Sequence, residues 1–435
     1  MATPTLSYYS FVPRNSNASF YYRILVPFMT ARDLGLPVRL QIDTNDAGIA
    51  TEDRVRGFCE SDFVVLYHPI SEPTLQNCRM AKSFIPSKRD GDWKYPPTLV
   101  IETDDNLFHV SPYNIAFRGL GIRDPEGKDI PKGHLIGDMQ DGKKRVLWKD
   151  GTENFDIMRN RQTLQTYREI LNTADLVSCS VPELADTIRT ETSARRVRVF
   201  PNLVRFDHYE QVRIEQDPSR VNILWQGGAS HYEDWHPLRD SMGKITREHP
   251  EVHWIIWGQL YHWVTDMIPP DRYTFVNWCP YQEYRLRLAM MNHDINLAPL
   301  ADNRFNRCRS AIKFYEASVL RKDIPTLAQA TGPYKNEMID GETGLLFNTP
   351  EEFETKLATL ITNASLRKTL GANAKDWVHQ NRDAFKEVPK QFAAYEEIRE
   401  TMKREQPHMP EEDWEKFEAE AERQREAAEA EPVEA

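Results

Sequence analysis

Short apolar runs rich in β-branched and aromatic residues recur along the chain, and longer stretches with helical periodicity separate them. Parallel sheets produce this alternation, because each strand is buried on both faces and a crossover helix must join neighbouring strands. In the first half the pattern predicts strands at 62–67, 98–103, 175–179 and 197–200, and helices at about 18–34, 71–84, 158–172 and 181–191.

A second series of strands follows a polar stretch near 201–220, where Pro201-Asn202 closes the first series. Its strands are predicted at 221–226, 253–257, 273–278, 295–299, 324–328 and 344–347. The chain has 435 residues, whereas one domain typically has about 150. The predicted fold class is therefore α/β, with two tandem domains that are each built on a parallel sheet.

The negative charge of the chain is concentrated in its C-terminal tail. The formal net charge is -11, but residues 411–435 hold eleven acids and three bases, which leaves -3 for the first 410 residues. Residues 1–200 carry 26 bases and 26 acids. The tail at 406–435 is expected to be flexible and solvated, and the acidity of the whole chain does not exclude a nucleic-acid partner for the globular part.

Several classes of protein are disfavoured by what the sequence lacks. It has no apolar run of the roughly 18 residues that a transmembrane helix needs, and its N-terminus does not resemble a signal peptide, so a cytoplasmic location is expected. The cysteines form no close pair, which argues against a disulfide framework and a zinc site. They are Cys59, Cys78, Cys179, Cys279 and Cys308.

One segment departs from the alternating pattern. Residues 117–151 hold seven of the 19 glycines and four basic residues close together, at Lys143, Lys144, Arg145 and Lys149. The segment is predicted to be a long loop or hairpin insertion. Such an insertion is often functional, although a plain solvent-facing excursion is an equal alternative.

The strongest candidate chemistry lies in the second half. A helix is predicted to begin near Arg309-Ser310, so its free N–H groups would lie beside Arg309, with Lys313 one turn further on, in an arrangement suited to a diphosphate. Glu316 follows three residues later and could accept hydrogen bonds from two ribose hydroxyls. The alternative for Glu316 is a salt bridge with Lys313 on the helix surface.

Two glycine turns follow strands of the same predicted sheet. Strand 221–226 leads into Gly227-Gly228-Ala229-Ser230-His231, and strand 324–328 leads into Gly332-Pro333-Tyr334. Glycines at these points let backbone amides approach a phosphate at the carboxyl end of the sheet, where ligands of open α/β folds bind. His231 could reach a phosphate or the sugar, or could simply be structural.

The first half offers weaker candidates. Asp104 and Asp105 end a strand and could bind hydroxyls of an acceptor or donor, or cap a helix. His68 follows a strand and could be a base or a polar contact, although a surface histidine is more common. Arg23 could face an anionic substrate. Of the six tryptophans between 225 and 278, five are expected in the core and only Trp278 near a ligand.

Five motifs in the second half resemble the donor domain of retaining glycosyltransferases with the GT-B fold, of the family-4 type (glycosyl transferases group 1). They are G-G-x-S-H-x-x-D at 227–234, V-N-W-x-P-Y-x-E-Y at 276–284, I-N-L-A-P-L at 295–300, F-N-x-x-R-S-x-I-K-x-x-E-A at 305–317, and G-P-Y with D-G-E-T-G-L-L at 332–346. The match covers about 221–365. Weaker agreement upstream, such as E-T-D-D-N-L-F at 102–108, resembles the acceptor domain of the same enzymes.

The resemblance implies two Rossmann-like domains that face each other across a cleft, and a UDP- or GDP-linked sugar donor transferred with retention and without metal or other cofactor. Its domains would be 1–205 for the acceptor, 206–384 for the donor, and a helix at 385–405 that crosses back to the first domain. Lys313 and Arg309 would neutralise the diphosphate, with help from Ser230, Ser310 and the amides of Gly227, Gly228, Gly332, Pro333 and Tyr334. Glu316 would bind the ribose, and Trp278 and Tyr281 would frame the base. Lys313, Glu316, Asp104 and His231 are the predicted catalytic residues.

One position departs from the family pattern. Cys308 stands where the first of two glutamates is usual, and that glutamate normally contacts the donor sugar. An inactive sugar-nucleotide-binding or scaffold protein is therefore the alternative function.

A metal-dependent GT-A enzyme fits poorly, because Asp90-Gly91-Asp92 lies in a polar loop and one nucleotide-binding sheet would not explain two series of strands. The acceptor stays open between a glycan, a small molecule, a protein and a modified DNA base, and so does the oligomeric state.

Overall fold

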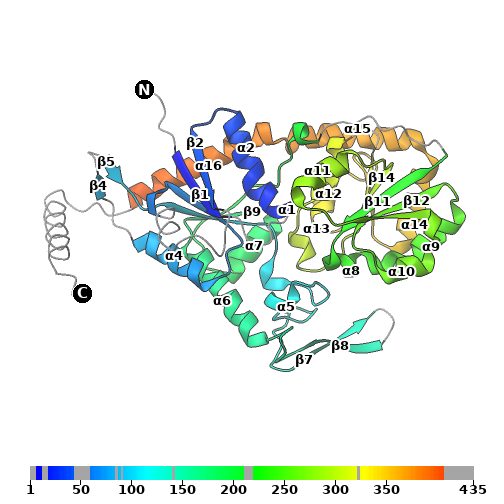
Figure 1. Ribbon diagram of the computed structural model, residues 1–435, viewed down its shortest axis with the longest axis horizontal. Helices are drawn as coiled ribbons and strands as arrows, with labels where there is room; N and C mark the ends of the chain where they lie inside the picture. Colours follow the sequence, from blue (N-terminus) through cyan, green and yellow to red (C-terminus); the bar gives the residue numbers. More distant parts are fainter. Residues whose placement is uncertain are drawn as a thin grey trace, which may run out of the picture.

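The computed structural model describes residues 6–11, 18–43, 59–83, 87–89, 92–139, 143–209, 219–320 and 324–405. Two six-stranded sheets dominate it, and every strand pair in both sheets is parallel. Figure 1 shows the two sheets side by side, each with helices around it. The predicted α/β class and the prediction of two tandem parallel sheets are therefore confirmed.

The first sheet has the strand order β10-β9-β6-β3-β1-β2. Its strands are β1 (Leu6–Phe11), β2 (Val38–Asp43), β3 (Phe63–Tyr67), β6 (Thr98–Thr103), β9 (Leu176–Cys179) and β10 (Val197–Val199). The four predicted strands are all present. Sequence reasoning missed β1 and β2, and β2 has a physical reason: it is an edge strand, and its exposed Arg39 and Gln41 break up the apolar run that marks a buried strand.

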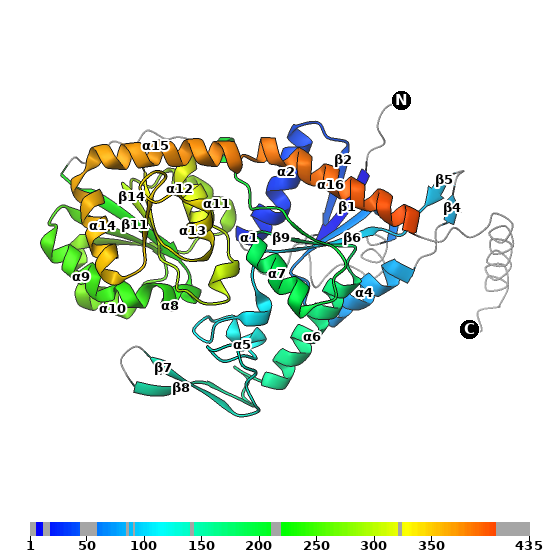
Figure 2. The ribbon, with the colours of Figure 1, turned by 180° about the vertical axis from the view of Figure 1, so that it is seen from behind.

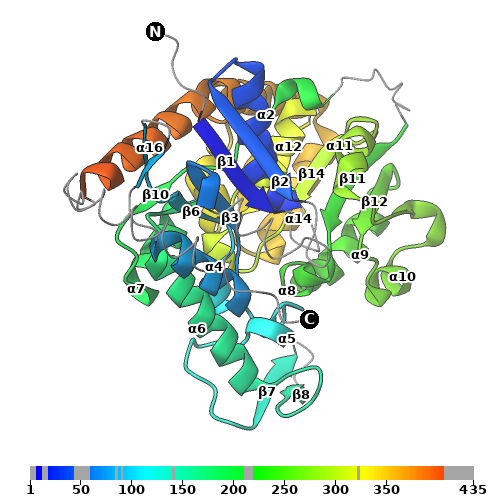
Figure 3. The ribbon, with the colours of Figure 1, turned by 60° about the vertical axis from the view of Figure 1, so that its left-hand side comes forward.

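Helices cover both faces of this sheet. Its helices are α1 (Ala18–Phe20), η1 (Tyr21–Leu25, a π-helix), α2 (Val26–Asp33), α4 (Glu72–Ser83), α6 (Ile157–Thr173) and α7 (Pro182–Glu191). In Figure 3, α2 lies with α16 (Ala384–Glu405) on one face of the sheet, and α4, α6 and α7 lie on the other. The predicted helices are confirmed; Pro182 starts α7, as a proline in the first turn should.

The second sheet has the order β13-β12-β11-β14-β15-β16, which is the Rossmann order 3-2-1-4-5-6. Its strands are β11 (Val221–Gly227), β12 (Val252–Gly258), β13 (Tyr273–Asn277), β14 (Ile295–Ala298), β15 (Thr326–Gln329) and β16 (Leu345–Phe347), and all six were predicted. Its helices are α8 (Tyr232–Trp235), α9 (Arg239–Glu248), α10 (His262–Met267), α11 (Tyr281–Ala289), α12 (Ile312–Leu320), α13 (Gly332–Glu337), α14 (Pro350–Thr362) and α15 (Ala364–Asn381). The topological switch lies between β11 and β14, where an open α/β sheet binds its ligand.

The two sheets belong to one packed body. A single cluster of buried apolar side chains runs from Tyr8 and Phe28, beside the first sheet, to Phe314 and Val378, beside the second. Figure 2 shows α15 and α16 running almost end to end across both halves. The helix α16 packs on α2, and the Tyr395 hydroxyl donates a hydrogen bond to Glu102 of the first sheet. The domain limits 205, 384 and 405 remain predictions.

The insertion contains α5 (Phe117–Leu120) and an antiparallel hairpin of β7 (His134–Met139) and β8 (Lys143–Lys149). A small apolar cluster that includes Phe117, Leu135 and Phe155 fixes its base. Figure 1 shows the hairpin projecting along the lower side of the molecule, toward the second sheet. A second short hairpin pairs β4 (Ser87–Arg89) with β5 (Asp92–Lys94).

Two of the sequence predictions fall outside the described residues: Asp90-Gly91 and the tail at 406–435. Within the described ranges, no helix combines the length and the apolar character needed to cross a membrane.

The five tryptophans predicted for the core are buried, whereas Trp278 is 70% exposed. The prediction that these five tryptophans lie in the core is therefore confirmed, and the proximity of Trp278 to a ligand stays a prediction.

Candidate functional site

The carboxyl ends of strands from both sheets meet at one place. The segment after β6 in the first domain contacts the segment after β14 in the second, where Asn106 Nδ2 donates to the Arg304 carbonyl at 3.3 Å. Nearby, Arg309 Nε lies 3.7 Å from Asp105 Oδ1. The residues predicted from both halves of the sequence are thus brought together at this junction, which we call the interdomain site.

Lys313 lies in the first turn of α12. Its ammonium makes no hydrogen bond or ion pair with any residue in the described part of the chain, and Nζ lies 6.0 Å from the centre of the Trp225 ring. Burial, and then the nearby Arg309, lower the pKa of Lys313 to about 8. Lys313 is partly buried, and a partly desolvated cation without an acceptor is costly, so an anion that enters the site would remove that cost.

Arg309 donates a hydrogen bond to His231, and His231 in turn is hydrogen-bonded to Asp234. His231 Nδ1 lies 2.6 Å from Asp234 Oδ2, and Arg309 donates to His231 Nε2 at 3.4 Å. Burial, and then Lys313, lower the pKa of His231 to about 4, so its ring is neutral at pH 7. The neutral ring donates from Nδ1 to Asp234 and accepts at Nε2 from Arg309. Asp234 also accepts from the Ala301 amide at 2.8 Å and from Asn306 Nδ2 at 2.7 Å.

The two glycine turns follow β11 and β15 at the carboxyl end of the second sheet, as the sequence predicted. A Cβ at Gly228 would meet no atom within 4 Å, so the backbone there faces open space, and Ser230 is only partly buried. A Cβ at Gly227 would meet the His231 ring at 2.8 Å. Gly332 has a φ of +39°, and a Cβ there would lie 2.7 Å from the Cα of Arg307. Gly332, Pro333 and Tyr334 form the first turn of α13, with Tyr334 buried.

Glu316 has a different environment from Lys313. It is 3% exposed, and it accepts hydrogen bonds from the Tyr22 hydroxyl, from Tyr284 at 2.9 Å and from Gln226 Nε2 at 3.3 Å. Tyr22 comes from the first domain, and its hydroxyl also lies 2.9 Å from that of Tyr209. Burial raises the pKa of Glu316 to about 7. The alternative of a surface salt bridge with Lys313 is wrong, because Glu316 is buried and is held by these hydroxyl and amide groups.

Ser310 is tied to the first domain. Its hydroxyl accepts from Asn202 Nδ2 at 2.9 Å, and Asn202 Oδ1 accepts from Arg23 at 3.2 Å. Arg23 itself is 3% exposed and pairs with the buried Glu102. The hypothesis that Arg23 faces an anionic substrate is therefore wrong, since an internal carboxylate already neutralises it.

Trp278 follows β13, and its ring lies beside Gly258, where an added Cβ would be 3.5 Å from it. Its large exposed ring offers a surface for a flat ligand. Tyr281 begins α11, but its side chain lies outside what the structure describes.

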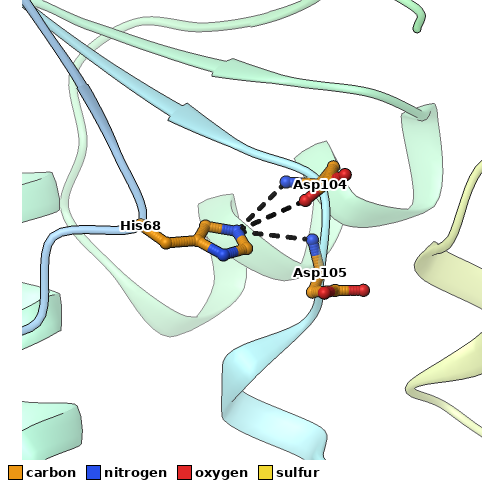
Figure 4. A group of neighbouring side chains, drawn as sticks. All are labelled: His68, Asp104 and Asp105. Carbon is orange, nitrogen blue, oxygen red and sulfur yellow. Dashed lines mark hydrogen bonds and ion pairs between the residues drawn. The ribbon is translucent and has the colours of Figure 1, made fainter. Parts of the chain in front are cut away.

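His68, Asp104 and Asp105 form a cluster at the edge of the first sheet (Figure 4), with candidate ligand atoms within 4.8 Å of one another. However, His68 Nε2 accepts the backbone N–H of Asp104 at 3.2 Å and that of Asp105 at 3.5 Å. A metal bound at Nε2 would have to displace these donors. His68 has a φ of +43°, which is strained for a residue with a Cβ, and burial lowers its pKa to about 4.

Cys308 packs between the domains. Its Sγ accepts from Asn106 Nδ2 at 3.3 Å and lies 3.6 Å from Thr187 Oγ1, and it belongs to an apolar cluster of the first domain. Burial raises the pKa of this thiol. The cysteine therefore stabilises the contact between the domains and is an inert thiol.

Sequence reasoning gave no role to several residues that contact the predicted ones: Tyr284, Asp234, Tyr22 and Tyr209. Tyr284 and Asp234 lie within the quoted motifs, and the i, i+3 spacing of His231 and Asp234 on a helical turn could have predicted their contact. Tyr22 and Tyr209 could not have been found, because they reach Glu316 only through the packing of one domain on the other.

No protein-family model matches the chain, and no curated protein sequence matches it. Solved structures of similar fold include HepE (Alr3699) from Anabaena in complex with UDP and glucose, at 13% identity and a TM-score of 0.56 over 90% of this chain and 99% of that one. Sucrose-phosphate synthase from Thermosynechococcus elongatus is similar at 12% identity and 0.57, over 90% and 99%. A glycosyltransferase from Rickettsia africae ESF-5 is similar at 11% identity and 0.58, over 91% and 98%. The chain has the GT-B fold of two Rossmann-like domains, as predicted.

Proposed function

We propose that the protein is a glycosyltransferase that moves a sugar from a nucleoside diphosphate to an acceptor. The observation that carries this proposal is the pair of cations at the interdomain site: Lys313, which is partly buried and has no acceptor among the described residues, and Arg309, which is 28% exposed and donates to His231. A departing diphosphate gains negative charge in the transition state, and two fixed cations stabilise that charge. The Gly228 backbone leaves room for a phosphate to approach.

The remaining donor contacts follow from this placement. The ribose would bind Glu316 by replacing the hydroxyls of Tyr22 and Tyr284, which now mimic a diol. The base would lie toward Trp278 and Tyr281. The bound UDP of HepE supports a UDP-linked donor. Retention, a family-4 relationship and independence from metal rest on the sequence motifs.

Within this proposal the chain's residues divide the work. Lys313 and Arg309 neutralise the leaving diphosphate, together with Ser230, Ser310 and the turn at 332–334. Asp234 and His231 orient Arg309, so His231 acts on the donor through that arginine. Asp104, buried and hydrogen-bonded by Tyr67 at 2.9 Å, supports the edge of the first sheet beside the reacting groups.

The acceptor would enter from the first domain, and a glycan, a small molecule, a protein and a modified DNA base all remain candidates. For DNA, the supporting feature is the hairpin, with exposed Lys144, Arg145 and Lys149. Arg23 cannot belong to a basic strip, because it is buried. Binding of duplex DNA that weakens steeply as salt rises would support a DNA acceptor, and binding that does not vary with salt would contradict it.

The experiment is incubation with a panel of UDP-, GDP- and ADP-sugars, and measurement of both binding and slow donor hydrolysis. The enzyme proposal requires hydrolysis or transfer of at least one donor. Tight binding without turnover, even with cell extract as a source of acceptor, would favour the inactive sugar-nucleotide-binding protein. Failure to bind any member would contradict both.

A further inference from the structure

Asp105 has a carboxylate that its own protein leaves unsatisfied. It lies directly after β6, and its oxygens accept no hydrogen bond from the residues that the structure describes. Its one charged contact is Arg309 Nε at 3.7 Å, across the domain junction. The neighbouring Asp104 differs, because its side chain is 8% exposed and accepts from Tyr67, whereas that of Asp105 is 26% exposed.

The backbone that carries Asp105 is nevertheless fixed. Its N–H and that of Asp104 point to His68 Nε2, and the Thr103 hydroxyl lies 3.4 Å from the Asp105 carbonyl and 2.5 Å from the same histidine nitrogen. Figure 4 shows the Asp105 carboxylate pointing away from His68. The strained backbone of His68 thus supports a turn that directs this carboxylate toward the interdomain site.

A carboxylate beside Arg309 cannot itself bind a diphosphate, because it would repel the phosphate oxygens. It can accept hydrogen bonds from hydroxyl groups, and each carboxylate oxygen has two acceptor sites. When a diphosphate engages Arg309, Asp105 loses its one cationic neighbour and is left facing whatever the diphosphate carries. Burial, and then Asp104, raise the pKa of Asp105 to about 6, which reflects a carboxylate short of partners.

We propose that Asp105 accepts hydrogen bonds from hydroxyls of the sugar that the diphosphate carries, and so selects the donor sugar. The proposal rests on the proposed function. It places a specificity residue in the first domain, opposite the cations of the second.

The test compares two ligands in two proteins. Wild type and Asp105→Asn are titrated with UDP and with UDP-glucose. If the wild type hydrolyses another donor, that nucleotide sugar and its nucleoside diphosphate are used instead. We expect Asp105→Asn to weaken binding of the nucleotide sugar about tenfold, and to leave the bare diphosphate unchanged or bound more tightly, because a repelling charge has gone. A donor whose sugar lacks the hydroxyl that Asp105 binds should bind the wild type more weakly than the intact donor does. The variant should bind these two donors equally.

The exposed Asp186→Asn on α7 is the matched control and should change neither affinity. Thermal unfolding of each variant shows whether the fold is intact. An equal loss for both ligands, or no loss for the nucleotide sugar, would overturn the assignment of Asp105 and leave the proposed function standing. A wild-type protein that binds no nucleotide sugar would overturn both.

Discussion

Lys313 and Glu316 lie three residues apart on α12, but they differ in how far other residues satisfy their charged groups. Lys313 is partly buried and its ammonium makes no hydrogen bond with the described residues, whereas the buried Glu316 carboxylate accepts hydrogen bonds from two tyrosine hydroxyls and an amide. One half of the proposed donor site is thus held ready for an anion, and the other half is occupied by internal groups. Under the proposed function, phosphates would bind to groups that need no rearrangement, while a ribose would have to displace the Tyr22 hydroxyl of the first domain from Glu316.

The largest effect is expected at Lys313. The variant Lys313→Ala should lower kcat by about 10²- to 10³-fold, because it removes a fixed cation from the developing charge. Donor hydrolysis measures this loss. The exposed Lys368→Ala on α15 is the control. Full activity of Lys313→Ala with an intact fold would contradict the diphosphate assignment.

The pH dependence of stability tests the environment of Glu316. Burial raises the pKa of Glu316 to about 7, from 4.5. Between these values the folded protein binds the proton that the unfolded chain has released, so the stabilising effect is present below the unfolded value and is lost as the pH rises through 7. The loss is about 3 kcal/mol of unfolding free energy.

Urea unfolding at pH 5 and pH 8 measures this effect. We expect Glu316→Gln to be less sensitive to pH than the wild type by about this amount, since an amide does not titrate. Equal pH dependence of the two proteins would show that Glu316 titrates at its ordinary value.

Gly228→Ala probes the prepared half without removing a charge. A Cβ at this position meets nothing within 4 Å in the free protein, so stability should stay within about 0.5 kcal/mol. The methyl group would lie where a phosphate is proposed to approach, and affinity for inorganic pyrophosphate should fall about tenfold. Isothermal titration measures it, and unchanged affinity would place the phosphates elsewhere.

Tyr22→Phe should have the smallest effect, and of opposite sign. It removes one competitor for Glu316, so UDP should bind about two- to tenfold more tightly, while pyrophosphate, which has no ribose, should bind as before. Tyr209→Phe is the matched control, because it removes a hydroxyl that contacts Tyr22 and leaves the Tyr22 bond to Glu316 in place. Weaker binding of UDP by Tyr22→Phe would mean that this tyrosine helps to hold the ribose.

The sequence predicted the elements that repeat a strong local pattern. All six strands of the second sheet and four strands of the first were found; most are buried apolar runs, and the partly exposed β13 and β10 still carry β-branched or aromatic residues. The edge strand β2 was missed, because its polar, exposed positions carry no such run. Lys313, Arg309 and the glycine turns were placed correctly relative to one sheet, because the carboxyl ends of parallel strands share an edge.

Contacts between residues far apart along the chain were beyond local reasoning. Arg23 and Cys308 both looked like residues of a ligand site, yet Glu102 neutralises the first and Asn106 and Thr187 enclose the second. Each of these partners lies far away along the chain. No periodicity or spacing records which distant side chain fills the space beside a residue.

By itself, then, the sequence determined the two parallel sheets and where along the second sheet the residues proposed to bind phosphates lie, because strand burial and helix starts depend on neighbours within a few residues. Only the tertiary structure decided that Glu316 is engaged by Tyr22, that Arg309 is oriented by His231, and that Asp105 faces Arg309 unsatisfied. The first and the last of these relations arise where one domain packs on the other, and the second arises within one domain between residues far apart in sequence; in each case the packing sets which polar groups keep a partner.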